Sequence, residues 1–416
     1  MEKPKADLYV TGAAEVVTCA PAPGNPLGRI AAGCLAAAGD RILAVGSPAD
    51  IAARADTSAA LVVDACGGVV APGFVDCHTH LVFGGSRSLE YAAKMTRTSA
   101  EVSAMGIPAG IPATVAMTRE TASERLVEES AGRLSRMFAS GSTTIESKSG
   151  YGLNWKAELK QLQTNRRLSR SCPVDLVPTF LGAHDFPVDM PRDRYVDLLV
   201  NEMIPAVAEM LLAEFCDVYC DQGYYTVNQT RRILEAGRSH GLKPKIHADA
   251  YSATGIADVA IELGAASMDH LNYTTPEEMK RLAKAGVVGV GLPALDFAVA
   301  HPDPVHLRAI LESGMTLALA TNLNPGNWTE TMHFVMVLAC RRHRLSPEEA
   351  MLAATSGAAA ALGRSAEIGA LKAGMLADIQ IWDIQSFEEY IYRLDRNPIV
   401  GLIKRGKVIF APSSGD

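Results

Sequence analysis

The chain has 416 residues, of which 48% are hydrophobic and 20% charged, a composition that is typical of a globular protein with one large core or two domains. Its net charge of −7 and its short basic clusters argue against nucleic acid as a partner and favour a small molecule. The first residues, "MEKPKADLYV", lack the apolar core of a signal peptide, and no run approaches the length of a membrane span. We therefore predict a soluble, cytoplasmic protein that does not bind a membrane.

The two ends of the chain share a β-rich pattern. Residues 8–70 contain short β-rich pieces such as "DLYVTG" and "AALVVDACGG", separated by turn signals. The tail has the same texture in "GALKAGMLADIQIWD" and "IVGLIKRGKVIF". We expect residues 1–68 and 365–416 to form one small β-domain together, although some hundreds of residues separate them.

The middle of the chain, residues 69–364, alternates apolar strand-like runs with helix-length periodic segments. Eight such runs occur in order: "GFVDCHTH", "STTIESKS", "VDLVPTFLGAH", "CDVYCD", "KPKIHAD", "AASMDHL", "GVVGVGLP" and "MTLALATN". Eight parallel strands with intervening helices predict an α/β fold of the (β/α)8 type, a TIM-like barrel whose active site lies at the carboxyl ends of the strands.

Polar side chains stand where these apolar runs end. A single buried histidine is usually a satisfied core group, but five histidines at strand ends favour a functional site. The residues in question are His78, His80, Glu146, His184, Asp221, His247, Asp249, Asp269, His270 and Asn322.

The pair His78 and His80 is the most specific feature of this set. Residues two apart on a strand point to the same side, so both imidazoles face the barrel mouth and can share one divalent transition metal. Imidazole suits either Zn or Fe, and the sequence does not separate them. His247, at the end of the fifth run, is the expected third ligand. Three protein ligands with an open position for water are the arrangement of a catalytic site.

Seven motifs along the chain together resemble the amidohydrolase superfamily, and within it the imidazolonepropionase family most closely. They are "PGFVDCHTHLVFGG", "TTIESKSGYGL", "TFLGAH", "KIHAD", "GAASMDHL", "ATNLNPG" and "GALKAGMLADI". The resemblance covers nearly the whole chain, and the order of the motifs matches the order of the predicted strands. It implies a metal-bearing barrel with a β-sandwich from both termini, and a hydrolase that cleaves C–N bonds in cyclic amides or amidines.

The resemblance also implies roles for individual residues. It makes His78, His80 and His247 metal ligands, and His270 a catalytic group near the reacting water. Arg87, Tyr151 and His184 become substrate contacts. Arg87 and Tyr151 suit an anionic nitrogen heterocycle, because a guanidinium offers a fork for a carboxylate and a phenol adds a donor. Arg87 could equally be a surface charge. Barrels of this kind often form dimers, so a homodimer is one assembly to expect.

Three positions depart from the family pattern. Asn322 stands where the family has an aspartate that binds the metal and takes the proton from the attacking water. An amide oxygen can approach a metal as a weak fourth ligand, but it cannot accept that proton at neutral pH. Ala250 follows "HAD" where a glutamate is usual, and Ala100 stands where a substrate-binding tyrosine is expected.

Three accounts of these departures compete. Asn322 could be an inactivating substitution in an ordinary imidazolonepropionase, although that would not explain Ala250 or Ala100. The chain could be a natural, divergent enzyme in which His270, Asp249 or Glu146 handles protons. It could also be a barrel that binds a ligand without catalysis. We favour the second account, because the histidines are intact and the changes cluster in the expected pocket. Metal content distinguishes it from the third.

Overall fold

The structure is a computed structural model that describes residues 3–412. Two compact units make up the chain. One contains the residues up to Asp76, the segment Met137–Thr144 and the residues from Thr331 onward, and the other contains Cys77–Arg136 and Ile145–Glu330. The domain boundaries that we placed after residues 68 and 364 stay a prediction. Within the described residues, no helix combines the length and the apolar character needed to cross a membrane.

The first unit holds two β-sheets built from both ends of the chain. A four-stranded sheet has the order β5-β4-β1-β6, and a six-stranded sheet has the order β18-β17-β16-β7-β2-β3. Their strands are β1 (Leu8–Thr11), β2 (Glu15–Val17), β3 (Arg29–Ala31), β4 (Cys34–Ala38), β5 (Arg41–Gly46), β6 (Leu61–Asp64), β7 (Val69–Pro72), β16 (Ile379–Trp382), β17 (Ile399–Lys404) and β18 (Lys407–Phe410).

The sandwich core explains why the two ends fold together. Strand β7 pairs antiparallel with β16, with Val70 opposite Ile381, so N-terminal and C-terminal segments share one sheet. Leu8 and Leu35 from the four-stranded sheet are buried in the same apolar cluster as Val70 and Ile381. Neither sheet could bury its apolar face without the other. The predicted β-sandwich from both termini is confirmed.

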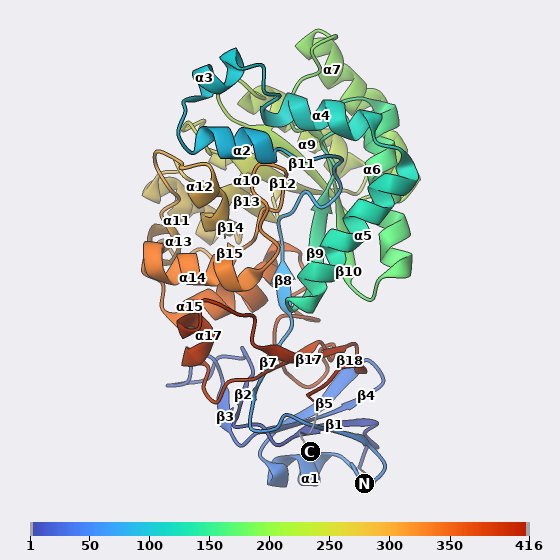
Figure 1. The fold of residues 1–416 in the computed structure, drawn as a ribbon, viewed down its shortest axis with the longest axis vertical. Coiled ribbons are helices and arrows are strands. Elements are labelled where there is room, and N and C mark those ends of the chain that lie inside the picture. Colours follow the sequence, from blue (N-terminus) through green and yellow to red (C-terminus); the bar gives the residue numbers. More distant parts are fainter. Residues whose placement is uncertain (1–2, 413–416) are drawn as a thin grey trace. The chain divides into compact units, whose positions relative to one another are not determined.

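All eight predicted barrel strands are present, in one parallel sheet whose order follows the sequence from β8 to β15 (Figure 1). They are β8 (Phe74–Asp76), β9 (Ser142–Lys148), β10 (Asp175–Ala183), β11 (Phe215–Cys220), β12 (Lys243–Ala248), β13 (Ser267–His270), β14 (Val288–Gly291) and β15 (Leu317–Leu319). The predicted (β/α)8 fold is confirmed.

Beyond the ends of β8 and β15, two backbone hydrogen bonds join the first and last barrel segments. The amide of Asn322 donates to the carbonyl oxygen of His78 at 3.0 Å, and the amide of His80 donates to that of Leu323 at 2.8 Å. Strand β8 itself ends at Asp76, so the two histidines lie on the extended segment after the strand. These bonds fix His78 and His80 beside Asn322.

Helices lie outside the barrel strands (Figure 1). Several begin at residues that the sequence marks as caps: the side chain of Thr275 accepts from the amide of Glu278, and Pro276 follows in the first turn. The helices of the second unit and its borders are α2 (Ser88–Lys94), α3 (Ser99–Ala104), α4 (Gly110–Glu120), α5 (Ser123–Ala139), α6 (Trp155–Ser171), α7 (Arg192–Leu198), η1 (Leu199–Met203, a π-helix), α8 (Ile204–Glu209), α9 (Val227–Ser239), α10 (Ala257–Leu263), α11 (Pro276–Lys284), α12 (Pro293–Ala298) and α13 (Leu307–Glu312).

The first unit also has helices. They are α1 (Pro48–Arg54), α14 (Met332–His343), α15 (Pro347–Leu352), η2 (Ala353–Gly357, a π-helix), α16 (Ala358–Ala361) and α17 (Glu388–Tyr392).

Candidate active site

Three of the predicted site residues leave their strands in the left-handed backbone region. Asp249 follows β12 with φ 54°, His270 ends β13 with φ 82°, and Asn322 follows β15 with φ 48°. Asp, Asn and His tolerate this region better than most residues, and such conformations concentrate at functional sites. The chain therefore turns sharply at the barrel mouth where the polar side chains lie.

The histidines form a single buried cluster in the second unit. The ring centre of His247 lies 4.4 Å from that of His78, 5.5 Å from that of His80 and 5.2 Å from that of His270. The ring of His184 stacks on His80 at 4.8 Å. Two sets made of histidines alone have ligand atoms close enough for one metal ion, His78 with His247 and His270, and His80 with His184 and His247. His247 belongs to both of these sets. Of the other two predicted ligands, His78 belongs only to the first set and His80 only to the second.

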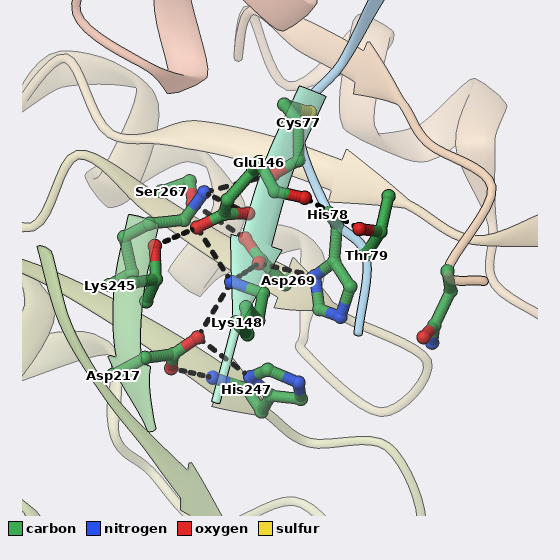
Figure 2. A network of polar contacts seen from close by, with 12 residues as sticks. Cys77, His78, Thr79, Glu146, Lys148, Asp217, Lys245, His247, Ser267 and Asp269 are labelled. Atoms are coloured by element: carbon green, nitrogen blue, oxygen red, sulfur yellow. Dashed lines mark hydrogen bonds and ion pairs between the residues drawn. The ribbon is translucent and has the colours of Figure 1, made fainter. Parts of the chain in front are cut away.

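Carboxylates hold two of these rings. Nδ1 of His78 lies 2.6 Å from Oδ2 of Asp269, and Nδ1 of His247 lies 2.9 Å from Oδ2 of Asp217 (Figure 2). A carboxylate accepts the proton of Nδ1–H, which leaves Nε2 of each ring as the nitrogen with a free lone pair. Both histidines therefore present Nε2 as a potential metal ligand.

The donor set fits a transition metal. Nε2 of His78 and Nδ1 of His80 are buried without a hydrogen-bond partner among the described residues. Nε2 of His80 and Nε2 of His247 are 3.5 Å apart, close to the roughly 3.4 Å expected for two imidazoles on one tetrahedral ion. Burial lowers the pKa of His78, His80 and His247 well below the usual value, so the three rings are neutral at pH 7.

Glu146 lies in an ion network outside the cavity. Its carboxylate accepts from the ammonium groups of Lys148 at 3.0 Å and Lys245 at 3.1 Å (Figure 2). It also accepts from the hydroxyl of Thr179 at 2.5 Å. The side chains of Glu146 and both lysines are fully buried. Glu146, which we predicted as a proton carrier, thus has its oxygens engaged by two cations.

A cavity of about 700 Å³ opens over the histidine cluster, entirely within the second unit. Tyr219 and Tyr224, which the sequence analysis did not single out, form one wall, with ring centres 4.1 Å apart. Predicted residues that line the cavity are His80, Arg87, Tyr151, His184, His247, His270 and Asn322.

Arg87 reaches the cavity already paired with a carboxylate. Its Nε and Nη2 donate to Glu90 at 2.5 and 3.2 Å, and Glu90 also accepts from Nζ of Lys94 at 2.6 Å. Arg87, Glu90 and Lys94 together carry a net charge of +1. A Cβ on Gly326 would lie 2.9 Å from Nη2 of Arg87, so a glycine there leaves room for the guanidinium. The sequence signal for Glu90 was its spacing of three and four residues from the two cations.

Tyr151 and His184 are held by one loop. The carboxylate of Glu158 accepts backbone N–H groups from Gly150 at 2.9 Å, Gly152 at 2.6 Å and Leu153 at 2.9 Å, which fixes the turn that carries Tyr151. Nδ1 of His184 donates to the carbonyl oxygen of Gly150 at 3.2 Å, and burial lowers the pKa of His184 to about 4. His184 is therefore neutral at pH 7.

Asp249, another predicted proton carrier, is bound by its own loops. Its Oδ1 accepts from the amide and hydroxyl of Thr254 at 2.9 and 2.7 Å, and its Oδ2 accepts from the hydroxyl of Thr274 at 2.7 Å. Asp249 is not among the described residues that line the cavity. Ala250 is buried beside it, and its carbonyl oxygen accepts from Nε2 of His301 at 2.9 Å.

Asn322 lies at the cavity wall with a fixed backbone. Its side-chain oxygen accepts from Nδ2 of Asn324 at 3.1 Å, and its carbonyl oxygen accepts from the side chains of Asn324 and Asn327 at 2.8 and 3.1 Å. His270, which also lines the cavity, has its pKa lowered by burial. Ala100 is exposed in α3, whereas the neighbouring Ser99 lines the cavity.

Comparisons with known proteins agree with this geometry. Residues 226–409 match the model of the amidohydrolase family. The chain is 40% identical to an imidazolonepropionase of Shouchella clausii, over 97% of this chain and 92% of that protein, and 42% identical to one of Alkaliphilus metalliredigens, over 91% and 90%. A crystal structure of an adenosine deaminase from Xanthomonas campestris with bound zinc has the same fold, with a TM-score of 0.76, 17% identity and coverage of 99% and 94%.

Proposed function

From its membership of the imidazolonepropionase family, within the amidohydrolase superfamily, we propose that this chain is a metal-dependent hydrolase of a small, anionic nitrogen heterocycle. The relatives are imidazolonepropionases, and the chain is accordingly a hydrolase acting on a C–N bond in a cyclic compound. The metal, its ligands, the proton carrier and the exact substrate are the parts that we propose.

The observation that carries the proposal is the cluster of buried, neutral imidazoles, of which those of His80 and His247 line the cavity. His78, His80 and His247 are the proposed ligands, with Asn322 as a weak fourth contact. The unpartnered, buried Nε2 of His78 costs free energy, and a bound ion would satisfy it. Zinc is bound in the adenosine deaminase of the same fold. Imidazole accepts Zn and Fe alike, so we propose one divalent ion of either kind per chain.

A bound ion would polarise the carbonyl or imine of the ring and lower the pKa of the attacking water. The chain must then accept the proton that the water loses. The amide of Asn322 cannot do so, and the carboxylates of Glu146 and Asp249 are held by lysines and threonines. His270 is the proposed proton carrier, because it lines the cavity and its lowered pKa keeps it neutral and able to accept a proton. Return of that proton to the leaving nitrogen would complete the opening of the ring.

The cavity wall supplies the proposed substrate contacts. Arg87, Tyr151 and His184 would bind the acidic group and a ring heteroatom. The net positive charge of Arg87, Glu90 and Lys94 together favours an anion there. Tyr219 and Tyr224 offer flat apolar surface to a planar ring.

We further propose that the reaction has diverged from that of the relatives. Without the carboxylate at position 322, the ion would keep more of its positive charge. Ala250 and Ala100 lie outside the residues that line the cavity, so the proposed divergence rests on position 322. This change fits a related heterocycle better than imidazolone propionate itself. The alternative, an inactivated imidazolonepropionase, is tested by restoring the carboxylate.

Turnover assays test the proposal directly. Purified protein loaded with Zn or Fe would be assayed with imidazolone propionate beside other five-membered cyclic amides and imines, with and without an acidic side chain. We expect metal-dependent ring opening of an anionic member of the series, and chelation should abolish it. A protein that cannot be loaded with metal would instead be a ligand-binding barrel.

A further inference from the structure

We propose that Lys148 is a positioning residue for the metal site, because its ammonium group joins the two carboxylates that orient His78 and His247. The inference rests on the metal site in the proposed function, and it assigns a task to a residue that does not touch the cavity.

Lys148 lies at the centre of the ion network in Figure 2. Its Nζ is 2.8 Å from Oδ2 of Asp217 and 3.5 Å from Oδ2 of Asp269, and all three side chains are fully buried. The same Oδ2 atoms lie against Nδ1 of His247 and Nδ1 of His78. One ammonium group therefore contacts both of the oxygen atoms that hold the histidine rings.

This arrangement links the orientation of the two rings. Asp217 comes from β11, Asp269 from β13, and Lys148 is the last residue of β9, so the ammonium group joins three separate strands. Each carboxylate is held between a cation and an imidazole N–H, and neither can turn without losing one of them. The partner groups around a ligating histidine fix its ring and tune its basicity.

Charge explains why the lysine is needed. Two ammonium groups, of Lys148 and Lys245, face three carboxylates, of Glu146, Asp217 and Asp269. Burial alone would lower the pKa of Lys148, but the carboxylates of Asp217, Glu146 and Asp269 outweigh it and raise the pKa, which keeps the group charged. Removal of that charge would leave Asp217 and Asp269 buried without their shared cation, and such carboxylates rearrange or draw in water.

Lys245 provides a matched control. Its side chain is equally buried and belongs to the same network, but its Nζ contacts Oε2 of Glu146 and the carbonyl oxygen of Cys77, each at 3.1 Å. Neither of these atoms holds a histidine ring. Loss of Lys245 removes no direct contact to a carboxylate that orients a histidine ring, although its charge also acts on Asp269. It should therefore cost stability to a similar degree and disturb His78 and His247 less than loss of Lys148.

The experiment compares Lys148→Met with Lys245→Met in the full chain. Each metal-free protein would be titrated with Zn²⁺ and with Co²⁺, whose visible spectrum reports the geometry of its ligands, after unfolding curves establish that both variants are folded. We expect Lys148→Met to weaken metal binding by about 10-fold to 100-fold and to change the Co²⁺ spectrum. Lys245→Met should keep the wild-type spectrum and bind within about 3-fold of wild type.

The results separate two claims, the proposed metal site and the positioning role of Lys148. If the wild-type chain binds neither ion, the proposed metal site fails. If it binds one ion and Lys148→Met binds it with unchanged affinity and spectrum, the role of Lys148 alone is overturned. Equal losses in both variants would also overturn it, because the network would then act only as support for the fold. If Lys148→Met does not fold, Lys148→Gln, which keeps a donor for one carboxylate, should show a smaller loss of affinity in the same direction.

Discussion

The backbone amide of Asn322 donates a 3.0 Å hydrogen bond to the carbonyl oxygen of His78, so the residue that we expect to depart most from the family pattern is tied to a proposed metal ligand. The side chain of Asn322 faces the same cavity as His80, His247 and His270. An asparagine in place of an aspartate would therefore change the charge and proton chemistry at the proposed metal site and leave this backbone hydrogen bond in place.

The first prediction concerns the metal. His247→Ala should empty the site, because His247 is the residue common to the two sets of ligand atoms that consist of histidines alone. Elemental analysis should find about one Zn or Fe per wild-type chain and a large loss in the variant. His240→Ala, which changes an exposed histidine, serves as control. If wild type contains much less than one metal ion per chain, and added Zn or Fe does not raise that content, both proposals of a metal-dependent reaction would be contradicted.

The second prediction concerns substrate binding. Arg87→Ala should weaken the binding of an anionic substrate or inhibitor by about 1.5–3 kcal/mol, the usual contribution of a hydrogen bond to a charged group. Arg87→Lys keeps the charge but loses the fork, so it should fall between wild type and Arg87→Ala. Calorimetric titration would measure both. A neutral or cationic compound that proves the best ligand would contradict this reading of the pocket.

Much of the fold was readable from the sequence, because buried parallel strands are apolar runs and each ends at a polar turn. Helix α6, Trp155–Ser171, gives a weak apolar signal in the sequence, because polar residues such as Gln161 and Asn165 fill part of its buried face. Helix α1, Pro48–Arg54, was missed because it is short and lies among β-strands, although Ser47, Pro48 and Asp50 carried the capping signal.

The third prediction is a dependence of stability on pH. The pKa of His184 is about 4 in the folded chain, against about 6.5 when unfolded, so between these values the unfolded state binds the extra proton. Stability is therefore lost as pH falls from 6.5 towards 4. From pH 7 to pH 5 this histidine alone should lower the free energy of unfolding of the metal-free chain by about 2 kcal/mol.

Urea unfolding of wild type and His184→Gln at the two pH values measures that contribution. The variant should lose less stability on acidification than wild type, by about the same 2 kcal/mol. The other buried histidines contribute in the same direction in both proteins, so the comparison measures His184 together with its effect on the pKa of His80 and His247. Parallel losses in the two proteins would show that His184 is not held neutral.

The fourth prediction concerns the proton carrier. His270→Ala should reduce kcat by about 10²-fold to 10⁴-fold, the usual contribution of a positioned acid or base, and leave the metal content unchanged. Metal analysis is essential here, because His270 also lies within ligand distance of His78 and His247. A variant that loses its metal together with its activity would identify His270 as a ligand.

The buried ion network was the part of the site that the sequence analysis missed. Lys148, Asp217 and Lys245 belong to strands in which every residue except Lys243 is buried, and a charged residue in such a strand needs a partner. That pattern was visible in "ESKS", "CDVYC" and "KPKIH", but it does not say which charges meet. Their pairing depends on the register of neighbouring strands, such as Asp217 opposite Lys245, which only the folded structure provides.

The most direct test of the divergent reaction is the activity of Asn322→Asp with imidazolone propionate, measured beside wild type and beside the substrate that wild type prefers. If the chain is a divergent enzyme, Asn322→Asp should give little or no ring opening of imidazolone propionate, because Ala250 and Ala100 still lack the expected groups. It should also impair the native reaction, because an anion beside the metal weakens its pull on the substrate. An increase of several orders of magnitude in imidazolone propionate hydrolysis would contradict divergence and identify the chain as an imidazolonepropionase inactivated at one position.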